Sequence, residues 1–255
     1  MKMFKGKNAV TVKMAAGAVI LIILCMAVFV GLTQKAKATM STDKVTASYT
    51  QGAESNLASA LRDGYVKQNY TVANDYTDGM TKKDMSGEAA AEYGAQNLWR
   101  LFHVSLQNEK VHMTYTPANS AQTHALWFGQ VNIGETMMYS FEVDAVTGAN
   151  YYAFRWDYSK KHEYTNPLTN YDDFVALGVS TAKQFSLISG DNLTGKFVQE
   201  RTTGKIGSGL VIDVLVTAKN GQKAMITFLK DSKDLVEVDY NSNVVQTETN
   251  LNSSK

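Results

Sequence analysis

Apolar side chains recur with a helical period in the stretch that ends near residue 102. One stripe at i, i+4, i+7 and i+11 consists of Ala91, Ala95, Leu98 and Phe102. This spacing predicts a helix from about Gly87 to Phe102 with one face against a core. Ser86 is placed to cap the helix, because its hydroxyl can accept a hydrogen bond from a free amide of the first turn.

After this helix the period changes to two, which is typical of strands, because successive side chains of a strand point to opposite faces. Apolar and polar residues alternate near 111–115, 126–131, 139–143 and 151–158. We therefore expect the helix to be followed by about four antiparallel strands.

The same pattern occurs again after Asn166-Pro167. Asp172 or Asp173 can cap a second helix, and strands are predicted near 196–200, 210–217, 223–230 and 234–240. Asn220-Gly221 predicts a two-residue hairpin, because both positions tolerate a positive φ. Shifting the chain on itself by about 87 residues brings these elements into the order of the first set.

A third feature is the uncharged apolar run at residues 14–32, which as a helix would span roughly 28 Å, close to the thickness of a bilayer core. Four lysines precede the run and two follow it closely. This asymmetry predicts a single-pass protein of the cell membrane, with a cytoplasmic N-terminus and an extracytoplasmic body. The alternative is a long signal peptide cleaved after Ala38, which would make the body a secreted protein.

The predicted fold class is therefore α+β, with an N-terminal transmembrane helix followed by two tandem units, each a helix packed on an antiparallel sheet of about four strands. We expect five divisions: an anchor or signal peptide at 1–38, a polar tether with room for a short helix at 39–83, a first unit at 84–165, a second unit at 166–245, and a polar tail at 246–255.

Charge and cysteine content exclude several classes of protein. The chain has 25 basic and 24 acidic residues, and six of the lysines lie in residues 1–38. The remaining 19 basic against 24 acidic residues give a mildly acidic body, which argues against nucleic-acid binding. Cys25 lies within the apolar run, so the body has no disulfide, no thiolate nucleophile and no cysteine metal ligand.

The residue types that carry catalysis or bind metals form no recognisable motif. The four histidines are widely spaced, and His162-Glu163 begins like a zinc-protease helix but has Asn166 where the second histidine is needed. There is no G-x-S-x-G elbow, and Asp172-Asp173 is better explained as the start of a helix. We therefore predict no catalytic residue, no metal ligand and no cofactor.

The aromatic side chains are the strongest remaining feature, and most of them should fill the core. Period two, however, places Trp127 and Phe128 on opposite faces of their strand, so one of them should lie away from the helix. We take Trp127 as the candidate for partner binding.

The segment from Asp144 to Gly148 is predicted to be a structural turn. Asp144 can accept hydrogen bonds from the following amides, Thr147 precedes the glycine, and Gly148 can adopt the left-handed conformation that such a hairpin requires.

Three segments together resemble a PepSY-type (YPEB-like) domain: the helix that starts at Ser86, the strand Leu126-Trp127-Phe128-Gly129, and the stretch from Tyr139 to Gly148 that ends in Asp-Ala-Val-Thr-Gly. The resemblance covers roughly residues 84–158. The second unit is divergent, with Lys230-Asp231-Ser232-Lys233-Asp234 in place of that turn. The resemblance implies an exported or membrane-anchored bacterial protein that regulates envelope peptidases or related enzymes, with no catalytic residues to transfer.

The resulting functional hypothesis is a membrane-anchored, extracytoplasmic, non-enzymatic protein that binds or regulates another envelope protein, with a peptidase or wall hydrolase as the expected partner class. The alternative is a ligand- or wall-sensing module that acts through a partner. A third hypothesis is an envelope hydrolase.

Overall fold

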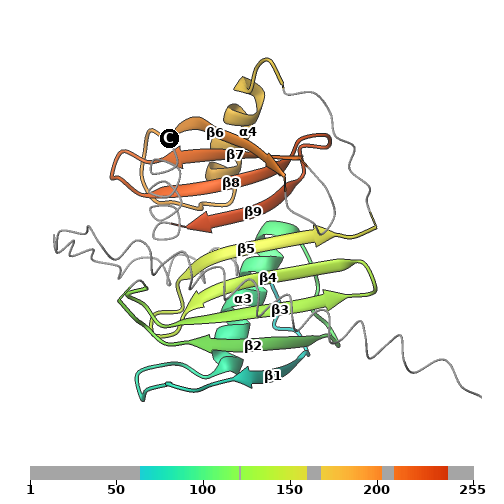
Figure 1. Cartoon of the computed structure of the whole chain (residues 1–255), viewed down its shortest axis with the longest axis vertical. Helices are drawn as coiled ribbons and strands as arrows, with labels where there is room; N and C mark the ends of the chain where they lie inside the picture. The colour runs from blue at the N-terminus through green and yellow to red at the C-terminus, as the bar shows by residue number, and fades with distance from the viewer. Residues whose placement is uncertain (1–63, 121, 160–167, 203–209, 241–255) are drawn as a thin grey trace, which may run out of the picture. The chain divides into compact units, whose positions relative to one another are not determined.

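A computed structural model describes residues 64–120, 122–159, 168–202 and 210–240 (Figure 1). The expectations for the apolar run at 14–32, the cleavage site after Ala38, His162 and the tail at 246–255 lie outside these described residues, and so do residues 39–63 of the tether in which a short helix was expected. In chain order the elements are β1 (Thr71–Tyr76), α3 (Gly87–Phe102), β2 (Lys110–Thr116), β3 (Leu126–Ile133), β4 (Met137–Asp144), β5 (Asn150–Asp157), α4 (Asp172–Gln184), β6 (Thr194–Thr202), β7 (Leu210–Thr217), β8 (Lys223–Leu229) and β9 (Leu235–Tyr240).

The nine strands form one mixed sheet in the order β1-β2-β3-β4-β5-β9-β8-β7-β6. The prediction of two units, each with its own sheet, is therefore wrong. β5 and β9 are each the last strand of a run of antiparallel hairpins, and each would otherwise expose an unpaired edge. They pair with one another through Tyr152–Asp239, Ala153–Val238 and Phe154–Glu237. Hydrophobic periodicity shows where strands lie but not which edges meet.

β1 lies in a segment that was expected to be a polar tether. It pairs with β2 in parallel, whereas every other described pair is antiparallel. The chain passes through α3 between β1 and β2, and a parallel pair requires such a crossover. The pairing of β1 shifts between Asn74 and Tyr76, and that of β6 between Phe197 and Gln199, so both outermost strands are irregular.

The two helices begin differently. α3 has the predicted bounds, and Ala89 N donates a 3.3 Å hydrogen bond to the hydroxyl of its cap, Ser86. α4 begins after Tyr171, whose side chain makes no capping hydrogen bond. The two aspartates expected as caps instead occupy the first turn, where their charge complements the helix dipole.

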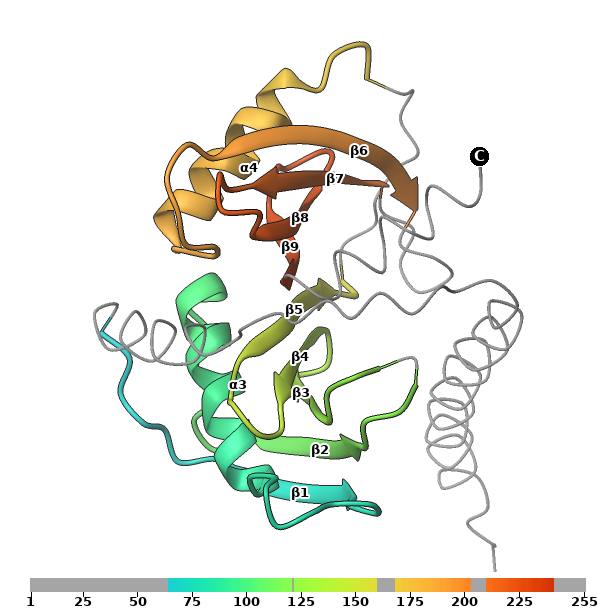
Figure 2. The ribbon, with the colours of Figure 1, turned by 90° about the vertical axis from the view of Figure 1, so that its left-hand side faces the viewer.

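Both helices pack on the same side of the sheet (Figure 2). α3 lies over β1 to β5 and α4 lies over β6 to β8, and a single buried cluster continues beneath them. We call the opposite side the helix-free face, because no helix of the described residues covers it.

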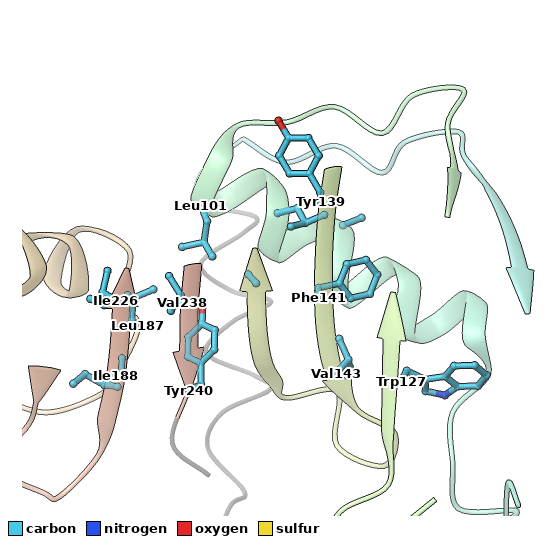
Figure 3. Packing of buried hydrophobic residues seen from close by; sticks show 14 of the residues in the cluster. Leu101, Trp127, Tyr139, Phe141, Val143, Leu187, Ile188, Ile226, Val238 and Tyr240 are labelled. Atoms are coloured by element: carbon cyan, nitrogen blue, oxygen red, sulfur yellow. The ribbon is translucent and has the colours of Figure 1, made fainter. Parts of the chain in front are cut away.

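α3 packs closely on the sheet at Phe141, whose side chain points toward the helix (Figure 3). A side chain at Gly94 of α3 or at Gly129 of β3 would collide with the Phe141 ring. The two glycines therefore let the backbones of helix and strand come close to a fully buried aromatic ring.

A buried polar contact joins α3 to the last described strand. The guanidinium of Arg100 is almost completely buried, and its Nη2 donates to Asn97 Oδ1 at 2.8 Å and to Tyr240 Oη at 3.0 Å. The Tyr240 hydroxyl in turn donates to Asn97 Oδ1 at 3.1 Å. Burial raises the pKa of Tyr240, so this phenol remains a neutral donor and acceptor. The triad fastens the helix over the β5–β9 junction.

No helix in the described residues is long and apolar enough to cross a bilayer, since α3 has 16 residues and α4 has 13. The predicted architecture with a transmembrane helix, and the membrane localisation built on it, are corrected on this finding.

Gly94→Ala tests the close approach at Phe141. Alanine favours a helix over glycine by about 1 kcal/mol, but a methyl group forced against a packed ring costs about 1–3 kcal/mol. We expect a net loss of stability in urea unfolding. Phe141→Leu in the Gly94→Ala background should recover part of that loss, and Lys183→Ala on the exposed side of α4 should change stability by less than about 0.5 kcal/mol. A Gly94→Ala chain as stable as the parent would contradict the packing described.

Candidate functional site

The register of the sheet determines which side chains share the helix-free face. One row crosses six strands through consecutive partners: Thr114, Phe128, Glu142, Tyr152, Asp239 and Met225. A second row lies beside it and contains Gln130, Ser140, Phe154, Glu237, Thr227 and Asp213. Aromatic and acidic residues therefore meet on this face near the β5–β9 junction.

Trp127, the candidate for partner binding, lies on the other side of the sheet. Its side chain is 0% exposed, its Nε1–H donates to Met85 O at 2.9 Å, and its ring packs edge-to-face on Tyr115 at 5.3 Å (Figure 3). It therefore helps to seat the segment that leads into α3 on the sheet, and a partner has no access to it in the folded chain.

Phe128 is the member of the pair that lies on the helix-free face, where it is half-buried. A signal for this assignment is present in the sequence. Gln130 and Asn132 have the same parity as Phe128, and Gly129 and Val131 have the parity of Trp127. Polar residues at alternate positions mark the side away from the core. The candidate position for partner contact therefore moves to Phe128.

β5 contributes an aromatic row to the same face. Tyr152, Phe154 and Trp156 alternate along the strand, with ring centroids 6.1 and 6.2 Å apart and nearly parallel planes. Tyr152 and Phe154 are half-buried, whereas Trp156 is buried with Val211, Leu229 and Val236. The row extends the apolar surface of Phe128 toward the second half of the sheet.

Four carboxylates surround this row; we call Glu142, Asp213, Glu237 and Asp239 the carboxylate cluster. They come from β4, β7 and β9, so residues almost 100 positions apart in the sequence are brought together. Asp213 accepts hydrogen bonds from Thr227 Oγ1 at 2.8 Å and from Gln199 Nε2 at 2.8 Å. No sequence motif could have revealed the cluster, because strand pairing assembles it. The pairing of β7, β8 and β9 brings Asp213, Glu237 and Asp239 together, and the pairing of β5 with β9 adds Glu142.

One guanidinium offsets part of this charge. Arg201 of β6 donates through Nε to Asp213 Oδ2 at 2.7 Å and through Nη2 to Glu237 Oε2 at 3.1 Å. Burial disfavours the charge of Arg201, but Glu237 and Asp213 outweigh burial and raise its pKa. Arg201 therefore stays charged and bridges β7 and β9.

Two carboxyls of the cluster, Glu237 and Asp239, have raised pKa values. Burial raises the pKa of Asp239 well above its ordinary value, and the neighbouring Glu237 and Glu142 raise it further. Burial also raises the pKa of Glu237, although Arg201 opposes that effect. Glu237 and Asp239 lie two residues apart on β9, in neighbouring rows of the same face. The same carboxylates and burial raise the pKa of Tyr152, which stays neutral.

The chemistry available on this face is recognition of cationic and apolar groups. Within the described parts of the chain, no three His, Cys, Asp or Glu side chains are placed to hold a metal ion. A half-buried aromatic ring beside carboxylates instead suits a basic side chain or an amine on an apolar segment.

The segment from Asp144 to Gly148 forms the predicted turn between β4 and β5, with contacts from Asp144, Thr147 and Gly148. Asp144 Oδ1 accepts hydrogen bonds from the amides of Val146 at 2.9 Å and Thr147 at 2.7 Å. The Thr147 hydroxyl accepts a hydrogen bond from the amide of Ala149, and Gly148 has a φ of +71°. Asp144 Oδ2 also lies 2.9 Å from Nδ1 of His124. This histidine contact, made from the β2–β3 connection, has no signal in the sequence.

A shallow groove of about 370 Å³ follows the solvent side of α3, lined by Lys67, Glu88, Ala89, Glu92, Tyr93 and Gln96. The carboxylate of Glu92 already accepts from the Tyr70 hydroxyl at 2.7 Å and from Gln96 Nε2 at 3.1 Å. The lining is polar and internally bonded, so the groove is a weaker candidate than the helix-free face.

The pair Trp127→Ala and Phe128→Ala tests the assignment of faces. Truncating the buried indole should cost about 3–5 kcal/mol, because it leaves a cavity and removes a hydrogen bond. Truncating the half-buried ring should cost about 1 kcal/mol. Urea unfolding measures both, and equal losses would show that the two rings are not on different faces.

Gly148→Val tests the turn. A β-branched residue at φ +71° is strained by about 1–3 kcal/mol, and its Cβ would also lie 2.7 Å from Cζ of the Tyr93 ring. The melting temperature should fall clearly. Val146→Ser, at a side chain of the same turn that is 54% exposed, should leave it nearly unchanged, and a similar fall in both would contradict the turn geometry.

Comparison with known proteins gives one structural similarity. No family model matches the chain, and no curated protein matches it. Among solved structures, the Bacillus megaterium YpeB C-terminal domain is similar with a TM-score of 0.41 and 8% sequence identity. The match covers 64% of this chain and 66% of the YpeB domain. This chain therefore spans slightly less than two thirds of the YpeB domain's length. Membership of the PepSY family stays a prediction from the sequence.

Proposed function

We propose that this chain is a protein-binding module that contacts its partner through the helix-free face, centred on Phe128 and Glu142. The observation that supports this function is the position of Phe128: a half-buried aromatic ring on the side of the sheet away from both helices, in register between Thr114 and Glu142. A ring that contributes little to the core is the type of residue that dominates binding energy at interfaces.

The chemistry of the face defines the partner. Aromatic rings supply apolar contact area, and the carboxylate cluster favours positive charge, so the partner should offer an extended or helical segment with apolar and basic side chains. The sequence resemblance to PepSY-type domains suggests a peptidase as the class of protein bound. The role proposed is to bind or regulate that enzyme, with no chemistry performed by this chain.

Site-specific photo-cross-linking tests the contact surface. A photoreactive phenylalanine at position 128 should give an adduct in the source cells that contains a second protein, whereas the same group at exposed position 146 should not. Glu142→Lys should reduce the adduct at least tenfold, because it reverses the charge facing a basic segment. Circular dichroism shows whether each variant keeps its fold.

Three outcomes would contradict the proposal: no adduct from position 128, equal adducts from 128 and 146, or an adduct with twice the mass of this chain. The last outcome would mean that the face binds a second copy.

A further inference from the structure

The groove on the solvent side of α3 continues beyond the cavity described above. A second cavity of about 220 Å³ adjoins the first, and the two share Lys67 and Glu88 in their linings. Its other walls come from Gln68, Tyr70 and Val72, which lead into and begin β1. The larger cavity alone, at about 370 Å³, is within the range of small-molecule sites, roughly 300–1,000 Å³. We call the two cavities together the α3 groove.

Both walls of the α3 groove are fixed by hydrogen bonds. One wall is the helix itself, and the other is the segment 67–72. This segment is tied to the loop that follows α3, because Leu106 N donates to Gln68 Oε1 at 2.5 Å. Asn108 N also donates to Asn69 O at 2.7 Å. A site whose walls are already ordered loses little conformational entropy when a ligand binds.

Two carboxylates of α3, one helical turn apart, line the groove. Glu88 accepts a hydrogen bond from Asn74 Nδ2 at 2.9 Å, and hydrogen bonds from its own amide and from Asn74 lower its pKa. Glu92 accepts from the Tyr70 hydroxyl at 2.7 Å through Oε2 and from Gln96 Nε2 at 3.1 Å through Oε1. A carboxylate can accept about four hydrogen bonds, so each oxygen of Glu92 has room for a further donor.

A buried hydroxyl near Glu92 has no hydrogen-bond partner in the described chain. It belongs to Tyr65, which is 7% exposed and whose ring packs edge-to-face on Trp99 at 6.4 Å between centroids. Burial and the charge of Glu92 raise the pKa of Tyr65, so the phenol keeps its proton. Buried polar groups are nearly always hydrogen-bonded, and a hydroxyl left over beside a groove is therefore a second indication of a ligand.

The charges of the groove define the chemistry of that ligand. Glu88 and Glu92 are four residues apart on the helix, a spacing at which like charges repel. An ammonium group placed between them would replace this repulsion with attraction. The Lys67 side chain is exposed and forms no ion pair with a described residue, so it is available to a carboxylate. One molecule that carries both an ammonium and a carboxylate group meets both requirements.

We propose that the α3 groove binds a small zwitterion, an amino acid or a short peptide, with its ammonium group held by Glu88 and Glu92 and its carboxylate by Lys67. The hydrogen bonds within the lining, which make the groove a poor contact surface for a large partner, orient its carboxylates for a small ligand. The site lies on the solvent side of α3, whereas Phe128 lies on the helix-free face of the sheet. Binding here is therefore independent of the protein contact proposed above.

An NMR titration of the purified, isotope-labelled chain with L-alanine and with L-alanyl-L-alanine tests the site. A dissociation constant on the order of 1 mM is expected for ligands of this size. Amide signals of residues 67–72 and 88–96 should shift, and those of 210–217 should not. Saturation by both probes identifies a free amino acid as sufficient, and saturation by the dipeptide alone identifies a peptide. No saturable shift with either probe, or equal shifts in 210–217, would overturn the proposal.

Blocked forms of whichever probe binds separate the two charges of the ligand. The N-acetylated form has no ammonium group and should bind about tenfold or more weakly, because it loses charge-assisted hydrogen bonds to the two carboxylates. The C-terminal amide has no carboxylate and should also bind more weakly. If the N-acetylated form binds as well as the unblocked probe, Glu88 and Glu92 do not hold an ammonium group.

Variants identify the groups responsible, with circular dichroism as the check on folding. Glu92→Gln should weaken binding of the unblocked probe about tenfold or more, and Glu88→Gln should do the same if the first variant does not fold. Lys67→Met should weaken binding of the unblocked probe and leave binding of its C-terminal amide unchanged. Glu135→Gln and Lys82→Met, at exposed side chains outside the groove, are the matched controls and should bind as the parent does. A folded Glu92→Gln or Glu88→Gln chain with the affinity of the parent would overturn the assignment.

Discussion

The pairing of β5 with β9 is the constraint on which the rest of this structure depends. It converts two runs of antiparallel strands into one sheet, places both helices over the same side, and leaves the opposite side without a helix of the described residues. β5 and β9 are joined by three residue pairs, which is a short contact between two strands. The buried Arg100–Asn97–Tyr240 triad supplies a second attachment, from α3 to β9. Removing one partner from such a buried triad would leave a desolvated polar group, which is why contacts of this kind are costly to break.

Local elements were predictable from the sequence because their signals are local. The stripe of Ala91, Ala95 and Leu98 gives the bounds of α3, and alternation gives eight of the nine strands. β1 was missed because an edge strand with an exposed surface needs no apolar alternation, and its existence depends on pairing with β2. The number of sheets was also missed. Two four-stranded sheets and one larger sheet have the same periodicity and differ only in which edges meet.

The candidate site shows the same division between local and long-range information. Parity separates Trp127 from Phe128, and the polar residues at 130 and 132 indicate which of the two faces outward. Trp127, which was predicted to be the outward-facing ring, is buried. The carboxylates at 142, 213, 237 and 239 look unrelated in the sequence. Pairing of β7, β8 and β9 makes the last three neighbours, and Glu142 joins them once β5 pairs with β9. The pairing of β5 with β9 therefore supports the fold and adds Glu142 to the most highly charged part of the helix-free face.

The irregular outer strands have a consequence for the behaviour of the molecule in a crowded cell. A nine-stranded sheet with two regular ends would be a template on which further chains could add strand by strand into fibrils. The shifts in register between Asn74 and Tyr76 at one end, and between Phe197 and Gln199 at the other, interrupt the rows of backbone donors and acceptors that such growth requires. Both ends of the described sheet are therefore poorer templates for a further strand than two regular edges would be.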